Sequence, residues 1–221
     1  MAKNYTANRR RNHTPPKRRK MSVLPYMLLA ILILVIFSAI YYFINFNVNK
    51  NVEKLEKAIK TYDVTYLEEK TDRLPIILDV LRKSYSDDSV KQEEFYDGNF
   101  SNLDLEVIDV TNKSKGKVVK LNIKNVNYID IYDGIEGNDD QTIVHNNYVK
   151  ELLTPNKDRT VMEANIFLER TLKGYKVYET REFINAILGG ALEYADDNPN
   201  VGDNNDNNDK NVGDEATSKG N

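Results

Sequence analysis

The pattern of apolar and polar positions begins with one long apolar run. From Val23 to Ile44 only Pro25 and Ser38 fall outside the apolar and aromatic set, and the run contains no charged residue. As an α-helix these 22 residues extend about 33 Å, enough to cross a hydrocarbon core of about 30 Å. A core helix of a soluble protein would carry polar positions on one face. The run therefore predicts a transmembrane helix over residues 23–46.

A cleavable signal peptide is the alternative interpretation of this run. The apolar region of a signal peptide usually covers about 7–15 residues and ends at a small-x-small cleavage site. Here the run is longer, and it closes on the bulky side chains of Tyr41, Tyr42, Phe43 and Phe46. The sequence therefore favours a retained anchor over a removed signal.

Three segments after the apolar run have helical character. In the first, apolar residues recur at steps of four, three, four and three, which places them on one stripe of a helix continuing out of the membrane. These residues are Val48, Val52, Leu55, Ile59 and Tyr62. The other two segments are "VTYLEEK" and "TDRLPIILDVLRKSYS". In the last, Thr71 or Asp72 is expected to cap the helix, and Pro75 lies in the first turn, where its missing N–H costs little.

After "YDGNFSN" the period changes to two, which is typical of half-buried strands. Residues 103–111 and 117–132 are predicted to pair as an antiparallel hairpin around the turn "NKSKG". The apolar side chains of the longer strand share one parity, so one face is expected to be packed. They are Val119, Leu121, Ile123, Ile129 and Ile131. Residues 159–171 and 175–179 form the second predicted hairpin, around "LKG".

Two further segments lie outside the predicted strands. Residues 133–158 interrupt the sheet: "DGIEGNDDQT" predicts a flexible loop, and "HNNYVKELL" predicts a short helix that Pro155 ends. The last predicted helix is "REFINAILGGALEYA". Thr180 is expected to cap this helix, and Gly189 and Gly190 are expected to weaken or end it.

The order of these elements, helices first and then four antiparallel strands, predicts an α+β domain whose helices cover the concave face of a curved sheet. From about Asp196 the chain is polar and mostly acidic, with too few apolar residues to offset the entropy of ordering. The predicted organisation has four parts. They are a basic arm at 1–22, a transmembrane helix at 23–46, the domain at 47–195 and a disordered acidic tail at 196–221.

Charge predicts the orientation of the apolar helix. Eight Lys and Arg residues and no carboxylate precede the run, whereas all 34 Asp and Glu residues follow it. Positive charge beside a membrane span is retained in the cytoplasm, so the N-terminus is expected inside the cell and the C-terminus outside. The run "PPKRRK" also fits a nuclear-targeting or nucleic-acid pattern, but a role in topology and contact with lipid headgroups is the simpler explanation.

The composition of the outer part narrows its partners and its chemistry. After residue 22 there are 23 cations against 34 carboxylates, a net charge of −11, which argues against nucleic acid as a partner. The chain has no cysteine, so it forms no disulfide and the domain is expected to be stable by packing alone.

A calcium loop in the tail is the one metal pattern that the sequence suggests. Asp203, Asn205, Asn207 and Asp214 have part of the spacing of such a loop. The glycine of its sharp turn is replaced by Asn208, the closing ligand is Asp rather than Glu, and no amphipathic helix follows. We therefore predict no metal-binding and no cofactor-binding residue.

Tyr128, Asp130 and Tyr132 are the closest approach to a catalytic group in the sequence. They alternate onto one face of the predicted strand, where a carboxylate near phenol donors could serve proton transfer. The alternative is that they form the wetter face of an edge-like strand, which we favour.

Two other polar features of the sequence are candidates for chemistry. Glu163, Asn165 and Glu169 share one face of a later strand, and the wet-face interpretation is again favoured. His145, the single histidine after the apolar run, lies in a predicted polar loop and has no His or Cys partner for a metal site or a triad. The sequence therefore predicts no catalytic residue.

The strand "VVKLNIKNVNYIDI" with its Asn-rich break, and the hairpin "VMEANIFLERTLKGYKVYE", resemble the membrane-anchored extracellular members of the NTF2-like superfamily of Gram-positive bacteria. These are cystatin-like, cone-shaped α+β proteins. The resemblance covers about residues 50–192 and implies leading helices packed into the bend of a long-stranded sheet. The insert at 133–158 departs from the compact version of this fold.

Three functions fit such a protein, because a fold does not choose among them. The first is a non-enzymatic surface module that binds another envelope protein or a small ligand. The second is a scaffold component of a conjugation or secretion apparatus, whose inner-membrane scaffold proteins look similar. The third is an isomerase or hydrolase that uses the mouth of the cone. In the absence of a catalytic motif the sequence favours the first.

Overall fold

The computed structural model of the chain describes residues 23–135, 137, 140–154 and 159–197. The chain divides into two compact units at Tyr41 and Tyr42, and each unit is described by itself. The predicted basic arm at 1–22 and the calcium-loop residues between 203 and 214 lie outside the described residues.

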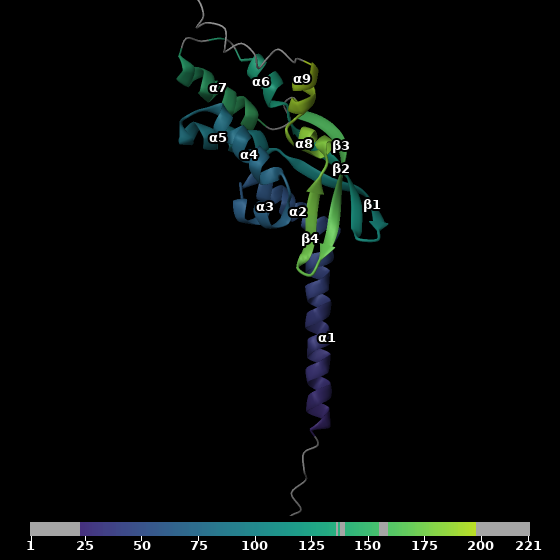
Figure 1. Ribbon diagram of the computed structural model, residues 1–221. Coiled ribbons are helices and arrows are strands. Elements are labelled where there is room, and N and C mark those ends of the chain that lie inside the picture. The colour runs from purple at the N-terminus through teal and green to yellow at the C-terminus, as the bar shows by residue number, and fades with distance from the viewer. Residues whose placement is uncertain (1–22, 136, 138–139, 155–158, 198–221) are drawn as a thin grey trace, which may run out of the picture. The chain divides into compact units, whose positions relative to one another are not determined.

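The first helix, α1, runs from Leu24 to Phe46 (Figure 1). Its sequence places apolar side chains on every side. No residue of α1 is buried, whereas a helix of a soluble core buries one side. By length and composition α1 can cross a membrane, and no other helix in the described ranges passes that test. An apolar helix near the N-terminus is compatible with a membrane anchor or a signal sequence.

The helix that follows α1 is separate from it, so the prediction of one continuous helix is wrong. Asn47 interrupts the chain with an extended backbone, and its side chain accepts a hydrogen bond from the Lys50 N–H at 3.0 Å. This is an N-cap, and it begins α2 (Val48–Lys60). The predicted apolar stripe is confirmed, because Val52, Leu55 and Ile59 are at most 2% exposed.

Three more helices precede the sheet. They are α3 (Val64–Lys70), α4 (Leu74–Tyr85) and α5 (Ser89–Ser101). The first two were predicted, but the cap of α4 is not Thr71 or Asp72. Instead the Glu179 carboxylate accepts hydrogen bonds from the backbone N–H groups at and just before the start of α4, those of Asp72, Arg73 and Leu74, at 3.0–3.4 Å. This long-range contact ties the start of α4 to the last strand.

Helix α5 was not predicted, because its sequence ends in "YDGNFSN", which reads as a turn. Gly98 lies inside the helix, and a Cβ at this position would stand 3.0 Å from the Leu152 Cβ. The glycine is therefore explained by packing, since it lets α5 approach a later helix closely. Phe95, Tyr96 and Phe100 supply the buried side of α5.

The four strands form one open antiparallel sheet in the order β1-β2-β3-β4, as the two predicted hairpins imply. Their bounds are β1 (Asp104–Lys113), β2 (Gly116–Val126), β3 (Arg159–Thr171) and β4 (Gly174–Glu179). The two hairpins join through β2 and β3, where Val119 pairs with Ile166 and Leu121 pairs with Ala164. A bulge interrupts the β1–β2 register between Val107 and Asp109.

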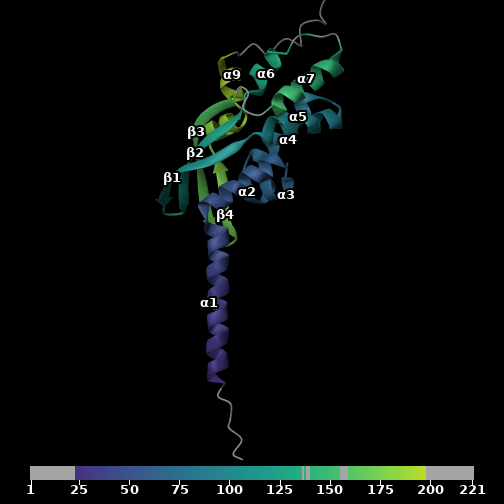
Figure 2. The ribbon, with the colours of Figure 1, turned by 180° about the vertical axis from the view of Figure 1, so that it is seen from behind.

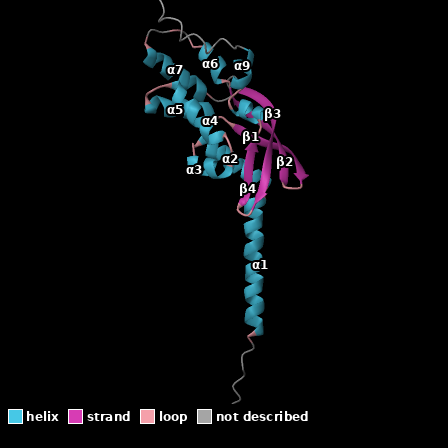
Figure 3. Ribbon diagram, viewed as in Figure 1, coloured by secondary structure: helices cyan, strands magenta, loops and turns pink. Residues whose placement is uncertain are grey.

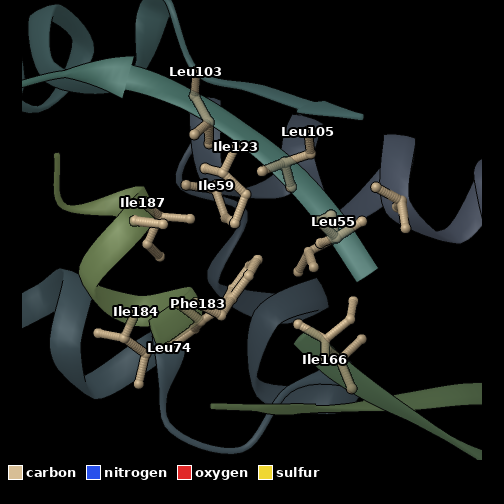
Figure 4. Close-up of a cluster of buried hydrophobic side chains, with 14 of the residues drawn as sticks. Leu55, Ile59, Leu74, Leu103, Leu105, Ile123, Ile166, Phe183, Ile184 and Ile187 are labelled. Carbon is tan, nitrogen blue, oxygen red and sulfur yellow. The ribbon is translucent and has the colours of Figure 1, made fainter. Parts of the chain in front are cut away.

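The helices that follow α1 gather on one side of the sheet, as Figure 3 shows, and the core lies between the two layers. The strands alternate as predicted: Val119, Leu121 and Ile123 are fully buried, while the side chains between them are half-exposed. Figure 4 shows Leu55 and Ile59 of α2 in the same cluster as Ile123 of β2 and Phe183 from the C-terminal part. The α+β fold class is confirmed.

Strand β2 is shorter than predicted, because the segment 127–132 is not part of it. The Asn127 side chain accepts hydrogen bonds from the N–H groups of Ile129 and Asp130, both at 3.2 Å, and this cap starts helix α6 (Tyr128–Asp133). The predicted short helix after it is longer than expected and runs from Gln141 to Leu153 as α7. Figure 2 shows α6 and α7 at one end of the domain.

The C-terminal prediction is confirmed in outline. Thr180 caps α8 (Arg181–Ile187) by accepting a hydrogen bond from the Phe183 N–H at 3.1 Å. Gly189 and Gly190 then adopt φ angles of +62° and +93°, which end the helix. Helix α9 (Ala191–Asp197) follows and reaches two residues into the segment predicted as tail.

Candidate ligand-binding pocket

A second, smaller apolar cluster lies apart from the main core. It joins Phe95 of α5, Val126 at the end of β2, Ile131 of α6, and Tyr148 and Leu152 of α7. The insert between the two hairpins supplies α6 and α7, so the segment that interrupts the sheet builds its own packed region against α4 and α5. This region holds a pocket with an aromatic lining.

The pocket has a volume of about 360 Å³ and is lined by eight residues, five of them aromatic. They are Leu81, Ser84, Tyr85, Phe95, Tyr128, Ile129, Tyr132 and Tyr148. Ligand pockets of proteins are typically concave, largely apolar and of this size. The lining residues come from α4, α5, α6 and α7, so each helix of this end of the domain contributes a wall.

The rings of the pocket hold one another in place. Tyr85 stacks on Phe95 with centroids 4.2 Å apart and planes 7° from parallel. Tyr132 meets Tyr148 edge to face at 5.2 Å and 82°. Such pairs contribute about 0.5–1.5 kcal/mol beyond their buried area, so the walls are preformed rather than assembled around a ligand.

A series of hydrogen bonds holds the Tyr85 side chain in the wall of the pocket. Its hydroxyl lies 2.7 Å from His145 Nδ1, and His145 Nε2 lies 2.7 Å from a Glu94 carboxylate oxygen. Burial raises the pKa of Tyr85, so its phenol is protonated at neutral pH and donates to Nδ1. The Glu94 carboxylate accepts a hydrogen bond from Nε2. The series links α4, α7 and α5.

Two other phenols that line the pocket, those of Tyr128 and Tyr148, are also neutral at physiological pH. Burial raises the pKa of Tyr128 and of Tyr148, so both side chains remain protonated. The Tyr148 hydroxyl donates to the Tyr128 carbonyl oxygen at 2.8 Å, which satisfies this buried group. The walls can therefore offer rings and hydroxyls, but none of the eight lining residues offers a charge.

The structure brings together two of the three residues that the sequence singled out. Because residues 128–133 form a helix, Tyr128 and Tyr132 stand one turn apart and both line the pocket. Asp130 is exposed and accepts a hydrogen bond from the Asn127 side chain at 2.5 Å. The predicted strand face of three residues is wrong, and the carboxylate does not join the phenols.

The second predicted group stays on the open face of the sheet. Glu163 forms an ion pair with Lys120 at 2.6 Å, and Glu169 accepts a hydrogen bond from Tyr178 at 3.0 Å. Asn165 is exposed on the same strand. These residues do not line the pocket, which agrees with the wet-face interpretation.

The prediction that His145 lies in a polar loop is wrong. The residue lies in α7 rather than in a polar loop, and only 6% of its surface is exposed. Among the described residues, no group of three or more His, Asp or Glu side chains is arranged to hold a metal ion. His145 instead supports the aromatic wall through Tyr85.

Sequence reasoning missed Tyr85, Phe95 and Tyr148 as pocket residues. Tyr85 lies in a helix that the sequence predicted, Phe95 in one that it did not, and Tyr148 in one that was predicted too short. The three helices are distant in the sequence, so their meeting could not be foreseen. The spacing of His145 and Tyr148, three residues apart in α7, was the one available signal, because it places both on one side of a helix. That signal shows only that the two residues share a side of the predicted helix, and it does not reveal what packs against them.

The chain matches no protein-family model, no curated protein and no solved structure. The interpretation of its function therefore rests on the residues described above.

Proposed function

We propose that this chain is a single-pass membrane protein whose domain after Phe46 lies outside the cell and binds a flat, largely apolar ring in the aromatic pocket. The ring belongs to a small ligand or to a side chain of an envelope protein. The observation that carries the proposal is the preformed pocket of five aromatic residues. The NTF2-like resemblance remains part of the proposal and fits the arrangement of helices on an open sheet.

The end of the apolar run supports an anchor over a removed signal. The Phe46 ring meets the Tyr175 ring of β4 edge to face at 5.4 Å, and the Asn51 side chain donates to the Asn45 carbonyl oxygen at 3.0 Å. The last turn of α1 is thus packed into the domain that follows. Cleavage after the run would remove part of that packing.

The pocket favours binding over the isomerase or hydrolase alternative. A steroid-isomerising site needs a carboxylate of raised pKa beside a phenol donor. None of the eight described lining residues is Asp or Glu, and Glu94 connects to the wall of the pocket through His145. The remaining chemistry of the walls, which is stacking and hydrogen bonding by phenols, suits recognition of a ring.

Replacing Tyr132 with alanine is expected to weaken the binding of a water-soluble aromatic probe, phenyl glucoside, by about 3- to 10-fold, the loss of one aromatic contact. Tyr132 is 52% exposed, so its removal opens one wall of the pocket without emptying the core. The measurement is a ligand-observed NMR titration of the full chain in lipid discs.

Tyr178→Ala is the matched control, because Tyr178 is a half-buried tyrosine on the open face of the sheet, away from the pocket lining. Its titration should overlay that of the unmodified chain. Equal weakening by both substitutions, or none by Tyr132→Ala, would show that the pocket does not bind the probe.

A further inference from the structure

Both hairpin turns lie at the same end of the sheet, and the β3–β4 turn lies next to the last turn of α1. In the register of β2 and β3, Gly116 pairs with Glu169, and the Arg170 N–H donates to the Lys115 carbonyl oxygen at 2.9 Å. This end also touches the close of the apolar run. A Cβ on Gly174 would stand 3.2 Å from the Asn45 carbonyl oxygen. Residues 45 and 46 belong to the same compact unit as the strands.

The β3–β4 turn presents an apolar side chain at its tip. Leu172 is 95% exposed, the largest exposed fraction among the exposed large apolar residues of the described ranges. The turn is fixed: the Thr171 hydroxyl donates to the Gly174 carbonyl oxygen at 2.8 Å, and the Lys173 N–H donates to that hydroxyl at 3.2 Å. Gly174 has a φ of +109°, which a side chain would disfavour. The exposure of Leu172 is therefore built into a tight turn.

Cations surround this tip, although the outer part of the chain is acidic overall. The two turns and their neighbours carry Lys113, Lys115, Arg170, Lys173, Lys176 and, from α3, Lys70. Beside the tip is a hollow of about 340 Å³ that is lined by Lys70, Lys173 and Lys176 together with Thr171. Glu69 is its one acidic lining residue, and Lys70 forms an ion pair with it at 3.0 Å.

We propose that the β3–β4 turn docks on the anionic lipid surface that α1 crosses, with Leu172 in the interfacial layer and the lysines of the hollow on headgroup phosphates. This inference rests on the membrane anchor of the proposed function. Two features support this occupant: the turn adjoins the end of the apolar run, and its charge is opposite to that of the lipids. Arg170, whose guanidinium lies 5.9 Å from the Phe46 ring centroid, joins both elements.

Docking in this way would direct the pocket away from the bilayer. Helices α6 and α7 lie at the end of the domain opposite the β3–β4 turn (Figures 1 and 2). The ring-binding pocket would then face the outside, where a soluble ligand or another envelope protein can reach it.

The experiment uses the full chain with one introduced cysteine, since the native chain has none. Leu172→Cys, labelled with the polarity-sensitive dye NBD, is inserted into discs of phosphatidylcholine with and without phosphatidylglycerol. We expect blue-shifted emission and quenching by nitroxide lipids, both stronger with the anionic lipid. Val90→Cys is the control, because Val90 is an exposed apolar residue (60%) at the start of α5, and its label should remain water-like.

A charge reversal tests the headgroup contact. The double substitution of Lys173→Glu and Lys176→Glu is expected to reduce the quenching at position 172 several-fold. The control Lys150→Glu, at an exposed position of α7, should leave the quenching unchanged. A chain that stays in the disc while the label at 172 remains water-like in both lipids overturns the docking proposal and leaves the anchor intact. A chain that does not stay in the disc overturns the anchor itself. Equal quenching in both lipids, insensitive to charge reversal, overturns the headgroup contact.

Discussion

Replacing Phe183 with alanine is expected to lower the free energy of unfolding by about 3–5 kcal/mol, the range for removing a buried aromatic ring and leaving a cavity. The Phe183 side chain has no exposed surface, and it lies in the main core between α8 and the sheet (Figure 4). The ring is part of the main apolar core, which joins the helices to the sheet. The measurement is chemical denaturation of the full chain in detergent, followed by the near-UV circular dichroism of its tyrosines.

Phe167→Ala makes the same chemical change on the other face of the same sheet. Phe167 is half-buried, and its main aromatic neighbour is Tyr178 at a centroid distance of 6.3 Å. We expect a loss of about 1 kcal/mol at this position, since little buried area is removed. Equal losses at the two positions would contradict the description of one packed and one wet face.

Gly189→Ala is expected to cost at least about 2 kcal/mol of stability, because two effects add. The φ of +62° is unfavourable for a residue with a side chain. A Cβ there would also stand 2.0 Å from the Val126 carbonyl oxygen, which is backbone and cannot turn aside. The strand end that carries Val126 leads directly into α6, so the change would disturb the pocket as well as the core. Thermal and chemical unfolding of the full chain measure the loss.

Gly137→Ala is the matched control for this prediction. Among the described residues, no atom lies within 4 Å of the position that a Cβ would occupy at Gly137. The substitution should change the free energy of unfolding by less than about 0.5 kcal/mol. A loss at Gly137 as large as that at Gly189 would show that the close approach to Val126 is not the cause.

Much of the fold could be predicted from local patterns. Alternation identified the strands, because a sheet packed on one face buries every second side chain, as Leu121 and Ile123 illustrate. Side-chain chemistry identified the start of α8, because Thr180 satisfies a free N–H of the helix. Both signals act over a few residues, so they survive without knowledge of the tertiary structure.

Other elements depend on contacts between distant residues and could not be predicted in this way. Helix α5 includes Gly98 because Leu152, 54 positions later, packs against it. The start of α4 is capped by Glu179, which is more than 100 positions away. The segment 127–132 is a different case, because the deciding signal was local. The alternation of Ile129 and Ile131 suggested a strand, but the cap at Asn127 begins a helix.

For the same reason, the candidate pocket could be predicted only in part from the sequence. Tyr128 and Tyr132 attracted notice through their spacing, and a helix brings them to one wall just as a strand would. Their partners Tyr85, Phe95 and Tyr148 come from three other helices, and no spacing within one segment reveals such a meeting. Residues that act through tertiary packing need the fold before they can be recognised.

The account depends most on the retention and direction of the apolar helix, and single cysteines in the otherwise cysteine-free chain test both. Lys57→Cys, on the exposed side of α2, should react with a membrane-impermeant maleimide on intact cells, and Asn8→Cys should react only after the cells are opened. The reverse pattern would contradict the proposed topology. Recovery of a chain that begins after Phe46 in the medium would contradict the anchor.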